Sequence, residues 1–192
     1  VDEYLQHLSN LPDQEPQKQI DNPAWHIHRG EPPHEDAHLS YSILLNLASV
    51  CHTEDKSVLW HFISRYRPDA TAETAPILDG LVERAINYYQ DFIKPHKKYR
   101  VATTSEQAAI QDLRAALDGL ALGAAAEDIQ TEVYEIGKRH EFENLRDWFR
   151  CLYEVLLGQE QGPRMGSFIA LYGLDETKDL LDRALAREDL SA

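Results

Sequence analysis

The stretch from Glu141 to Glu176, EFENLRDWFRCLYEVLLGQEQGPRMGSFIALYGLDE, decides the fold class. Its apolar residues recur every three or four positions, which is the period of an α-helix. Asn144 is suited to cap the first helix, because its side-chain oxygen can accept a hydrogen bond from a free amide. Gly158 is expected to end that helix in the left-handed conformation. Pro163 is expected at the start of the next helix.

The polar loop between these two helices, residues 159–164 (QEQGPR), has two interpretations. It is either a turn between core helices or a rigid site that presents long polar side chains to a partner such as a nucleic acid. Trp148 lies in the apolar stripe of the first helix, so it is expected in the core.

The remaining chain has the same helical period, and we expect about nine helices in an all-α fold. Trp25 and Ile27 alternate with histidines, so residues 24–28 are compatible with a short extended segment. The long helix over residues 74–93 carries Phe92 on its apolar face. Ser105 is expected to cap the helix that follows, and Asp175 the last helix. We expect one helical subdomain over residues 1–94, a basic linker over 95–104 and a C-terminal helical bundle over 105–192.

Composition excludes several classes of protein. The 192 residues are 43% hydrophobic and carry a net charge of −14, which disfavours indiscriminate binding to DNA or to anionic membranes. No apolar run approaches the roughly 20 residues of a membrane span, and the first residues do not resemble a signal peptide. A start at Val1 inside a helical pattern suggests a fragment or a processed product. Cys51 and Cys151 are expected to be buried free thiols, which indicates a cytoplasmic protein.

Positive charge gathers in two places. Residues 94–100, KPHKKYR, contain four Lys or Arg side chains and no acid. This run is either a solvated linker or a strip that contacts phosphates, with Tyr99 available to stack on a base. Lys138 and Arg139 form a second basic island at the end of a helix, where the helix dipole alone also favours cations.

Catalytic and metal-binding motifs are not apparent. His26, His28, His34 and His38 cluster, but they lack a cysteine partner or an HExxH pattern, so surface or capping roles are expected rather than a metal site. The sequence contains no P-loop, no GxSxG and no CxxC. The residues alone therefore predict an all-α binding module.

A family resemblance rests on the stretch quoted above. VYEIGKRH followed by NLRDWFRCLYEVLLGQEQGPRMGSFIALYGLDET resembles the C-terminal part of class I lysyl-tRNA synthetases. NPAWHIHRGEPP, LLNLASV and LWHFISRY resemble the part just before it, so the resemblance runs from about Asp21 to Leu185. The ending also resembles the terminal helices of glutamyl-tRNA synthetases. The implied fold is the helical cage that binds the anticodon in both families.

The resemblance implies a function for the parent enzyme. That enzyme joins lysine to its tRNA with ATP and Mg²⁺ through a lysyl-adenylate, in a Rossmann domain with HIGH and KMSKS signatures. Neither signature occurs in this sequence, and WHIH at residues 25–28 lacks the glycine of HIGH. The chain would then be the anticodon-recognising portion, inactive by itself and without a cofactor of its own. Its partners would be the lysine tRNA and the catalytic domain of the same parent chain, with no DNA or membrane partner.

The lysine anticodon is a uridine-rich single-stranded loop, read by stacking and by hydrogen bonds to base edges. Arg164, at a helix N-terminus beside a rigid proline, suits a phosphate or a base edge. The amides of Gln159 and Gln161 suit a uracil edge. Phosphate contacts are expected from Lys97, Lys98, Arg100, Lys138 and Arg139, and stacking from Tyr99.

Two alternatives stay open. One alternative is the anticodon domain of a glutamyl-tRNA synthetase. The other is an acidic all-α module that docks a partner helix in a groove and binds no RNA.

Overall fold

The computed structural model describes residues 1–33, 35, 39–140 and 142–190. Within these residues the chain is helical and contains no strand, which confirms the predicted fold class. The eleven α-helices are α1 (Asp2–Asn10), α2 (Pro16–Ile20), α3 (Pro23–Ile27), α4 (Tyr41–Cys51), α5 (Lys56–Tyr66), α6 (Pro76–Tyr88), α7 (Thr104–Asp118), α8 (Ala126–Arg139), α9 (Leu145–Leu152), α10 (Met165–Tyr172) and α11 (Leu174–Leu185). Two π-helical turns, η1 (Tyr89–Ile93) and η3 (Tyr153–Leu157), extend α6 and α9, and a short 3₁₀ turn, η2 (Lys94–His96), follows η1.

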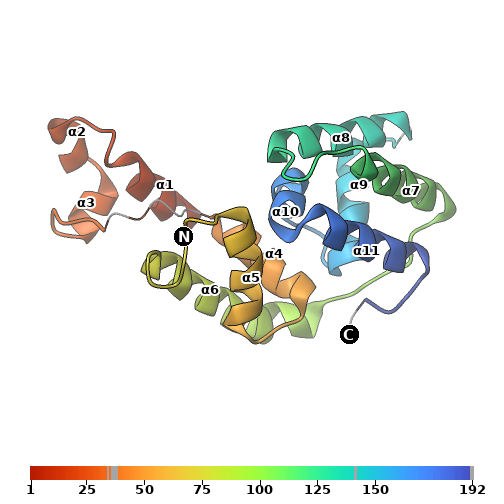
Figure 1. Ribbon diagram of the computed structural model, residues 1–192, viewed down its shortest axis with the longest axis horizontal. Helices are drawn as coiled ribbons and strands as arrows, with labels where there is room; N and C mark the ends of the chain where they lie inside the picture. The colour runs from red at the N-terminus through yellow and green to blue at the C-terminus, as the bar shows by residue number, and fades with distance from the viewer. Residues whose placement is uncertain (34, 36–38, 141, 191–192) are drawn as a thin grey trace.

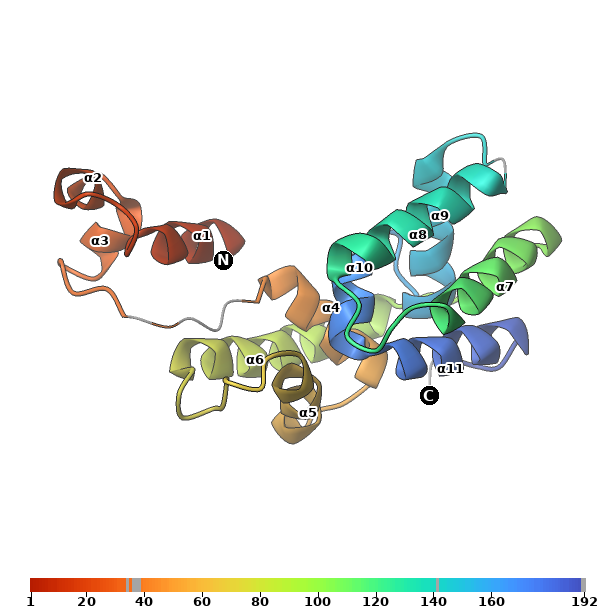
Figure 2. The same cartoon turned by 45° about the horizontal axis from the view of Figure 1, so that its top comes forward.

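Three groups of helices follow one another along the molecule (Figures 1 and 2). Helices α1–α3 project at one end, α4–α6 lie in the middle, and α7–α11 lie at the other end. Helix α10 packs on α8 and also contacts α4 and α5. Side chains that precede residue 95 in the sequence and side chains that follow residue 104 therefore share one hydrophobic core. The division into subdomains over 1–94 and 105–192 stays a prediction.

Helices α1–α3 enclose a much smaller apolar cluster. Its buried members are Leu8, Leu11 and Ala24, and Ile77 of α6 packs against it. Polar contacts also tie this end to the middle helices. The buried carboxylate of Glu35 accepts hydrogen bonds from the backbone N–H groups of Ile77 and Leu78, at 2.7 and 2.8 Å.

Several expected features of the opening stretch are confirmed. The Asn144 side chain accepts a hydrogen bond from the backbone N–H of Arg146 at 2.9 Å, and Gly158 ends η3 with φ of +67°. Trp148 is fully buried and donates from Nε1 to the carbonyl of Val133 at 2.8 Å. Of the two thiols, Cys151 is buried and Cys51 is half-buried, and both are free.

Residues 24–28 are not extended, so that interpretation is wrong. Pro23 begins α3, and the Asn22 side chain accepts a hydrogen bond from the backbone N–H of Ala24 at 2.9 Å. This cap and a proline in the first turn favour a helix over the alternation of Trp25 and Ile27. The five-residue helices α2 and α3 are also the two beyond the expected nine.

Two expected caps are wrong as well. Helix α7 begins at Thr104, and Thr103 caps it through a capping box in which Glu106 reaches back to the Thr103 backbone N–H. Helix α11 begins at Leu174 after Gly173, so Asp175 lies inside the first turn, where its charge still favours the helix dipole. None of the helices in the described ranges is both long and apolar enough to cross a membrane.

The crossing of α10 over α8 yields a testable prediction. A Cβ atom at Gly166 would lie 2.2 Å from the backbone oxygen of Ala126 and 2.6 Å from the backbone nitrogen of Gln130. Gly166→Ala should therefore lower the free energy of unfolding by about 1–3 kcal/mol, as expected for overpacking. Urea unfolding followed by circular dichroism measures the change. Gly119→Ala is the control, because its Cβ would meet nothing closer than 3.4 Å. Equal unfolding midpoints for the two variants would contradict the close packing.

Candidate nucleic-acid interface

The basic run 94–100 lies beside the end of η3. It leaves the middle helices through η2 and runs as an extended segment toward α7 (Figure 1). The backbone N–H of Lys98 donates to the carbonyl of Gly158 at 2.9 Å. A surface cleft of about 560 Å³ lies between this segment and the turns η1 and η3. Its lining is Phe92, Ile93, His96, Lys97, Lys98, Tyr99, Arg100, Glu154, Gly158, Gln159 and Glu160.

Lys97 is half-buried. Its Nζ donates to the carbonyl of Ser49 at 2.8 Å and lies over the rings of Tyr99 and Tyr89, 4.9 and 5.6 Å from their centroids. Burial lowers the pKa of Lys97 to about 8, because the charged form is the one that loses hydration. The hydrogen bond and the two cation–π contacts offset part of the cost of burying the Lys97 charge at the floor of the cleft.

Tyr99 packs against the loop that follows η3. A Cβ atom at Gly158 would lie 3.0 Å from the Tyr99 ring, so only glycine fits beside it in the left-handed conformation seen there. The Tyr99 hydroxyl lies 3.4 Å from Nε2 of His52, and burial raises the pKa of Tyr99. Gly158 and Lys97 thus cover much of the ring that we expected to stack on a base.

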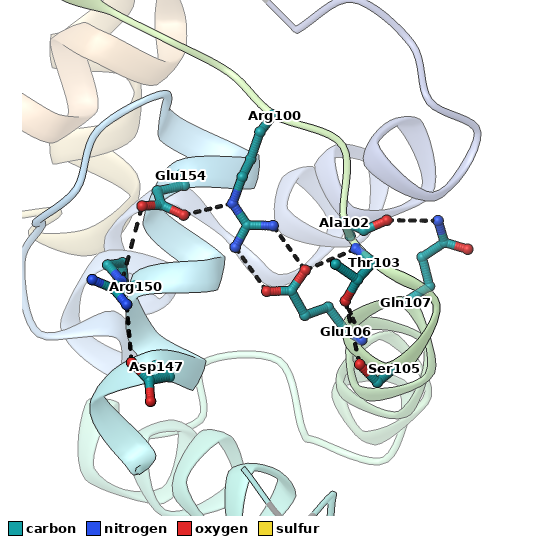
Figure 3. Close-up of polar contacts among 9 residues, drawn as sticks. All are labelled: Arg100, Ala102, Thr103, Ser105, Glu106, Gln107, Asp147, Arg150 and Glu154. Atoms are coloured by element: carbon teal, nitrogen blue, oxygen red, sulfur yellow. Dashed lines mark hydrogen bonds and ion pairs between the residues drawn. The ribbon is translucent and has the colours of Figure 1, made fainter. Parts of the chain in front are cut away.

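Arg100 is held by two carboxylates (Figure 3). Its Nη1 and Nη2 each lie 2.7 Å from an oxygen of Glu106, and its Nε lies 2.5 Å from Glu154. The Arg100 guanidinium lowers the pKa of Glu106 to about 2. Since Glu106 also completes the capping box with Thr103, Arg100 links the start of α7 to η3. A phosphate would have to compete with both carboxylates for this side chain.

The loop 159–164 forms a braced corner. Gln159 donates from Nε2 to Oγ of Ser49 at 3.1 Å, which joins the loop to α4. The Tyr153 hydroxyl donates to the carbonyl of Pro163 at 2.7 Å. Gln161 is exposed, and the exposed Arg164 forms a bidentate ion pair with Glu127 at the start of α8. Arg164 precedes α10, which begins at Met165 and not at Pro163 as expected.

Lys138 and Arg139 lie at the opposite end of α8. Lys138 pairs with Glu135 at 2.7 Å and lies over the Tyr134 ring, 5.1 Å from its centroid, while Arg139 pairs with Asp112 at 2.9 Å. The expected contact residues therefore lie in three places. Lys97, Lys98, Tyr99, Arg100 and Gln159 line one cleft, whereas Arg164 and the pair Lys138–Arg139 lie near the two ends of α8, a helix of roughly 20 Å.

The exposure of the Phe92 side chain was not predicted from the sequence. We placed it on the apolar face of the helix over 74–93, but its side chain is 60% exposed, so that assignment is wrong. The π-helical turn η1 is the physical reason, because its extra residue breaks the 3.6-residue register after Tyr89. Ile93 takes the inward position instead. Ser49 and His52, which contact the cleft floor, also carried no signal in the sequence.

No group of three or more metal-binding side chains occurs among the described residues. His28 contacts the Tyr4 hydroxyl through Nε2 at 2.7 Å, and His26 is exposed. His34 and His38 lie outside the described residues.

We expect Arg100→Met to lower the free energy of unfolding by about 1–2 kcal/mol at pH 7, because two carboxylates lose charged hydrogen bonds. The pKa of Glu106 is depressed, so its contribution is present above its ordinary value of 4.5 and is lost as the pH falls toward about 2. The difference from wild type should shrink over that range in urea titrations. Arg150→Met is the control: Arg150 also faces Glu154 but is 58% exposed, and it should change stability less. Identical effects at pH 7 would contradict the role of Arg100.

A second pH dependence follows from Lys97. Below pH 8 the folded and unfolded chains both carry the Lys97 proton, and the folded chain suffers the cost of burying the charge. Between about pH 8 and the ordinary value of 10.5 the folded chain loses this proton first, so the cost fades. The stability of Lys97→Met relative to wild type should therefore be highest at pH 7 and decline by pH 10. Lys98→Met replaces the neighbouring exposed lysine as the control. A relative stability that rises with pH would contradict this sign.

Known proteins resemble this chain over its whole length. No protein-family model matches it. A lysine–tRNA ligase from Roseobacter denitrificans is 48% identical over 191 residues, which is 100% of this chain and 36% of the relative. A lysine–tRNA ligase from Rickettsia bellii is 48% identical over 96% of this chain, and one from Rickettsia massiliae is 50% identical over 88%. The chain thus spans 36% of the length of the first of these relatives, and throughout that span it is similar to a lysine–tRNA ligase.

Proposed function

We propose that this chain is the tRNA-binding, anticodon-recognising portion of a class I lysine–tRNA ligase. The observation that carries the proposal is the 48% identity to a lysine–tRNA ligase along the entire chain. At this level of identity the helices and their packing are expected to be shared. The assignment to class I and to the C-terminal part of the enzyme is supported by the stretch 141–176, on which the resemblance rests.

The structure supports a binding role rather than a self-sufficient catalytic one. The fold is all-helical in the described residues, and the sequence has neither HIGH nor KMSKS. The adenylate chemistry, with ATP and Mg²⁺, would belong to a catalytic domain outside this sequence. That domain and the lysine tRNA are the proposed partners, and the cytoplasm is the proposed compartment. On its own the chain should form no lysyl-tRNA.

The cleft lined by η1, η3 and the basic segment is the proposed RNA contact. It presents the exposed Lys98, while Lys97 and Arg100 line it with their charged groups held by partners within the chain. The exposed Gln161 and Arg164 belong to the loop that continues from it. In a chain with 33 acidic and 19 basic side chains, the rest of the surface would repel phosphates. Such repulsion favours one orientation of the RNA.

A fluorescence anisotropy titration tests the proposal. A lysine tRNA transcript should bind more tightly than the same tRNA with a swapped anticodon and more tightly than a glutamate tRNA. Equal affinity for all three RNAs, or no binding, would reject anticodon recognition by this chain. Tightest binding to the glutamate tRNA would favour the other synthetase family. Binding of a protein partner that hardly changes with salt, without RNA binding, would favour an interaction module.

Lys98 and Arg164 should behave differently in this assay. Lys98→Ala should weaken all RNAs alike and reduce the slope of log affinity against log salt by about one, as expected for one lost phosphate contact. Arg164→Ala should instead reduce the preference for the lysine anticodon. Lys18→Ala, which removes an exposed lysine from α2, is the matched control. A salt slope unchanged by Lys98→Ala would show that this lysine does not contact the RNA.

A further inference from the structure

Two π-helical turns contribute to the same cleft. Phe92 and Ile93 come from η1, and Glu154 comes from η3, which Gly158 terminates. A π-helical turn disturbs the regular hydrogen-bond pattern of a helix and is frequently found at functional sites. Because the turns belong to helices far apart in the sequence, their meeting at one cleft points to a shared role.

The turn η1 displays an aromatic ring at the edge of this cleft. Phe92 is 60% exposed, more than any other aromatic side chain of the described residues. Tyr88 packs against it, with 4.9 Å between ring centroids and planes tilted by 34°. Tyr88 is itself 44% exposed, so the two rings form a small apolar surface. Adjoining exposed apolar side chains that are rimmed by polar residues are a feature of binding surfaces.

The charges around Phe92 indicate the chemistry of that ligand. Residues 92–100 contain four Lys or Arg side chains and no acid, and Asp91 precedes them. Lys94 pairs with Glu54 at 3.6 Å, and Arg100 pairs with two carboxylates. Lys98 is exposed in the same cleft, and Nδ1 of His96 lies 3.0 Å from the carbonyl oxygen of Phe92. Of the two carboxylates in the lining, Glu154 is paired with Arg100 and Glu160 is exposed. An exposed ring beside cations fits an unpaired base and its phosphate, because the ring offers a stacking face and the cations contact the backbone.

We propose that Phe92, supported by Tyr88, is a stacking platform for one unpaired base of the bound RNA, whose adjacent phosphate Lys98 contacts. This inference rests on the proposed tRNA-binding function and adds a binding residue to it. Tyr99, the aromatic that the sequence suggested, is covered by Gly158 and Lys97, whereas Phe92 is open to solvent.

The test uses the full 192-residue chain and a lysine tRNA transcript. Stacking of one base on an aromatic side chain changes affinity by roughly 5- to 150-fold, so Phe92→Ala should weaken binding at least fivefold. Phe92→Trp should keep the wild-type affinity, because it keeps a stacking face. Tyr66→Ala, which removes another exposed aromatic outside this cleft, should bind as wild type does. Urea unfolding midpoints should agree among all four proteins, since both rings are exposed.

A direct readout is the fluorescence of 2-aminopurine in a short uridine-rich oligoribonucleotide. Wild type and Phe92→Trp should quench it by stacking, and Phe92→Ala should not. If wild type prefers the lysine tRNA but Phe92→Ala binds and quenches equally well, the platform is rejected and the proposed function stands. If wild type binds no RNA, both are rejected. If Phe92→Ala changes only self-association in sedimentation velocity, the surface is a protein contact and the platform is rejected.

Discussion

The guanidinium of Arg100 is the interaction on which the geometry of the cleft depends. It engages Glu106 with two nitrogens and Glu154 with the third, and these carboxylates belong to α7 and η3. Glu106 also closes the capping box that begins α7. A planar guanidinium can bind one acid with two nitrogens and the other acid with the third, whereas a lysine would offer both acids a single nitrogen. The basic segment that precedes Arg100 is therefore fixed relative to η3, and with it the two sides of the cleft.

Because the chain is acidic, many of its Lys and Arg side chains form ion pairs with carboxylates of the same chain. With 33 acidic and 19 basic side chains, most cations have a carboxylate within reach. Arg139 and Arg164 looked available for RNA in the sequence, yet they pair with Asp112 and Glu127. These pairs are exposed, so they are weak and exchangeable, in contrast to the clamp around Arg100. Lys97 differs from Arg100, Arg139 and Arg164, because its ammonium contacts a backbone carbonyl and two aromatic rings.

The sequence predicted what depends on local periodicity. Apolar spacing located the long helices and the burial of Trp148, and Asn144 and Gly158 bounded α9 and η3 as expected. The sequence-based prediction failed at α3, where two local signals compete. The Asn22 cap and the proline in the first turn favour a helix and override the alternation of apolar and polar residues that suggested an extended segment. The predicted burial of Phe92 was also wrong, because the residue types in an apolar helical stripe do not indicate where a π-helical turn adds a residue. The pairing of Arg100 with Glu154 could not be predicted from local sequence, since Glu154 lies 54 positions away in the chain.

The small apolar cluster under α1–α3 has a consequence for how the molecule opens. The cluster has three buried members among the described residues, Leu8, Leu11 and Ala24, whereas the main core draws chiefly on α4 to α11 and takes in only Leu5 from α1 as a buried residue of α1–α3. The free energy of local unfolding follows the number of buried apolar contacts, so it is lowest at this end. Backbone amides of α1–α3 should exchange with solvent through partial openings that leave the cleft intact. The chain thus combines a cooperative body that holds its binding surface in place with an end that opens and recloses many times for each global unfolding event.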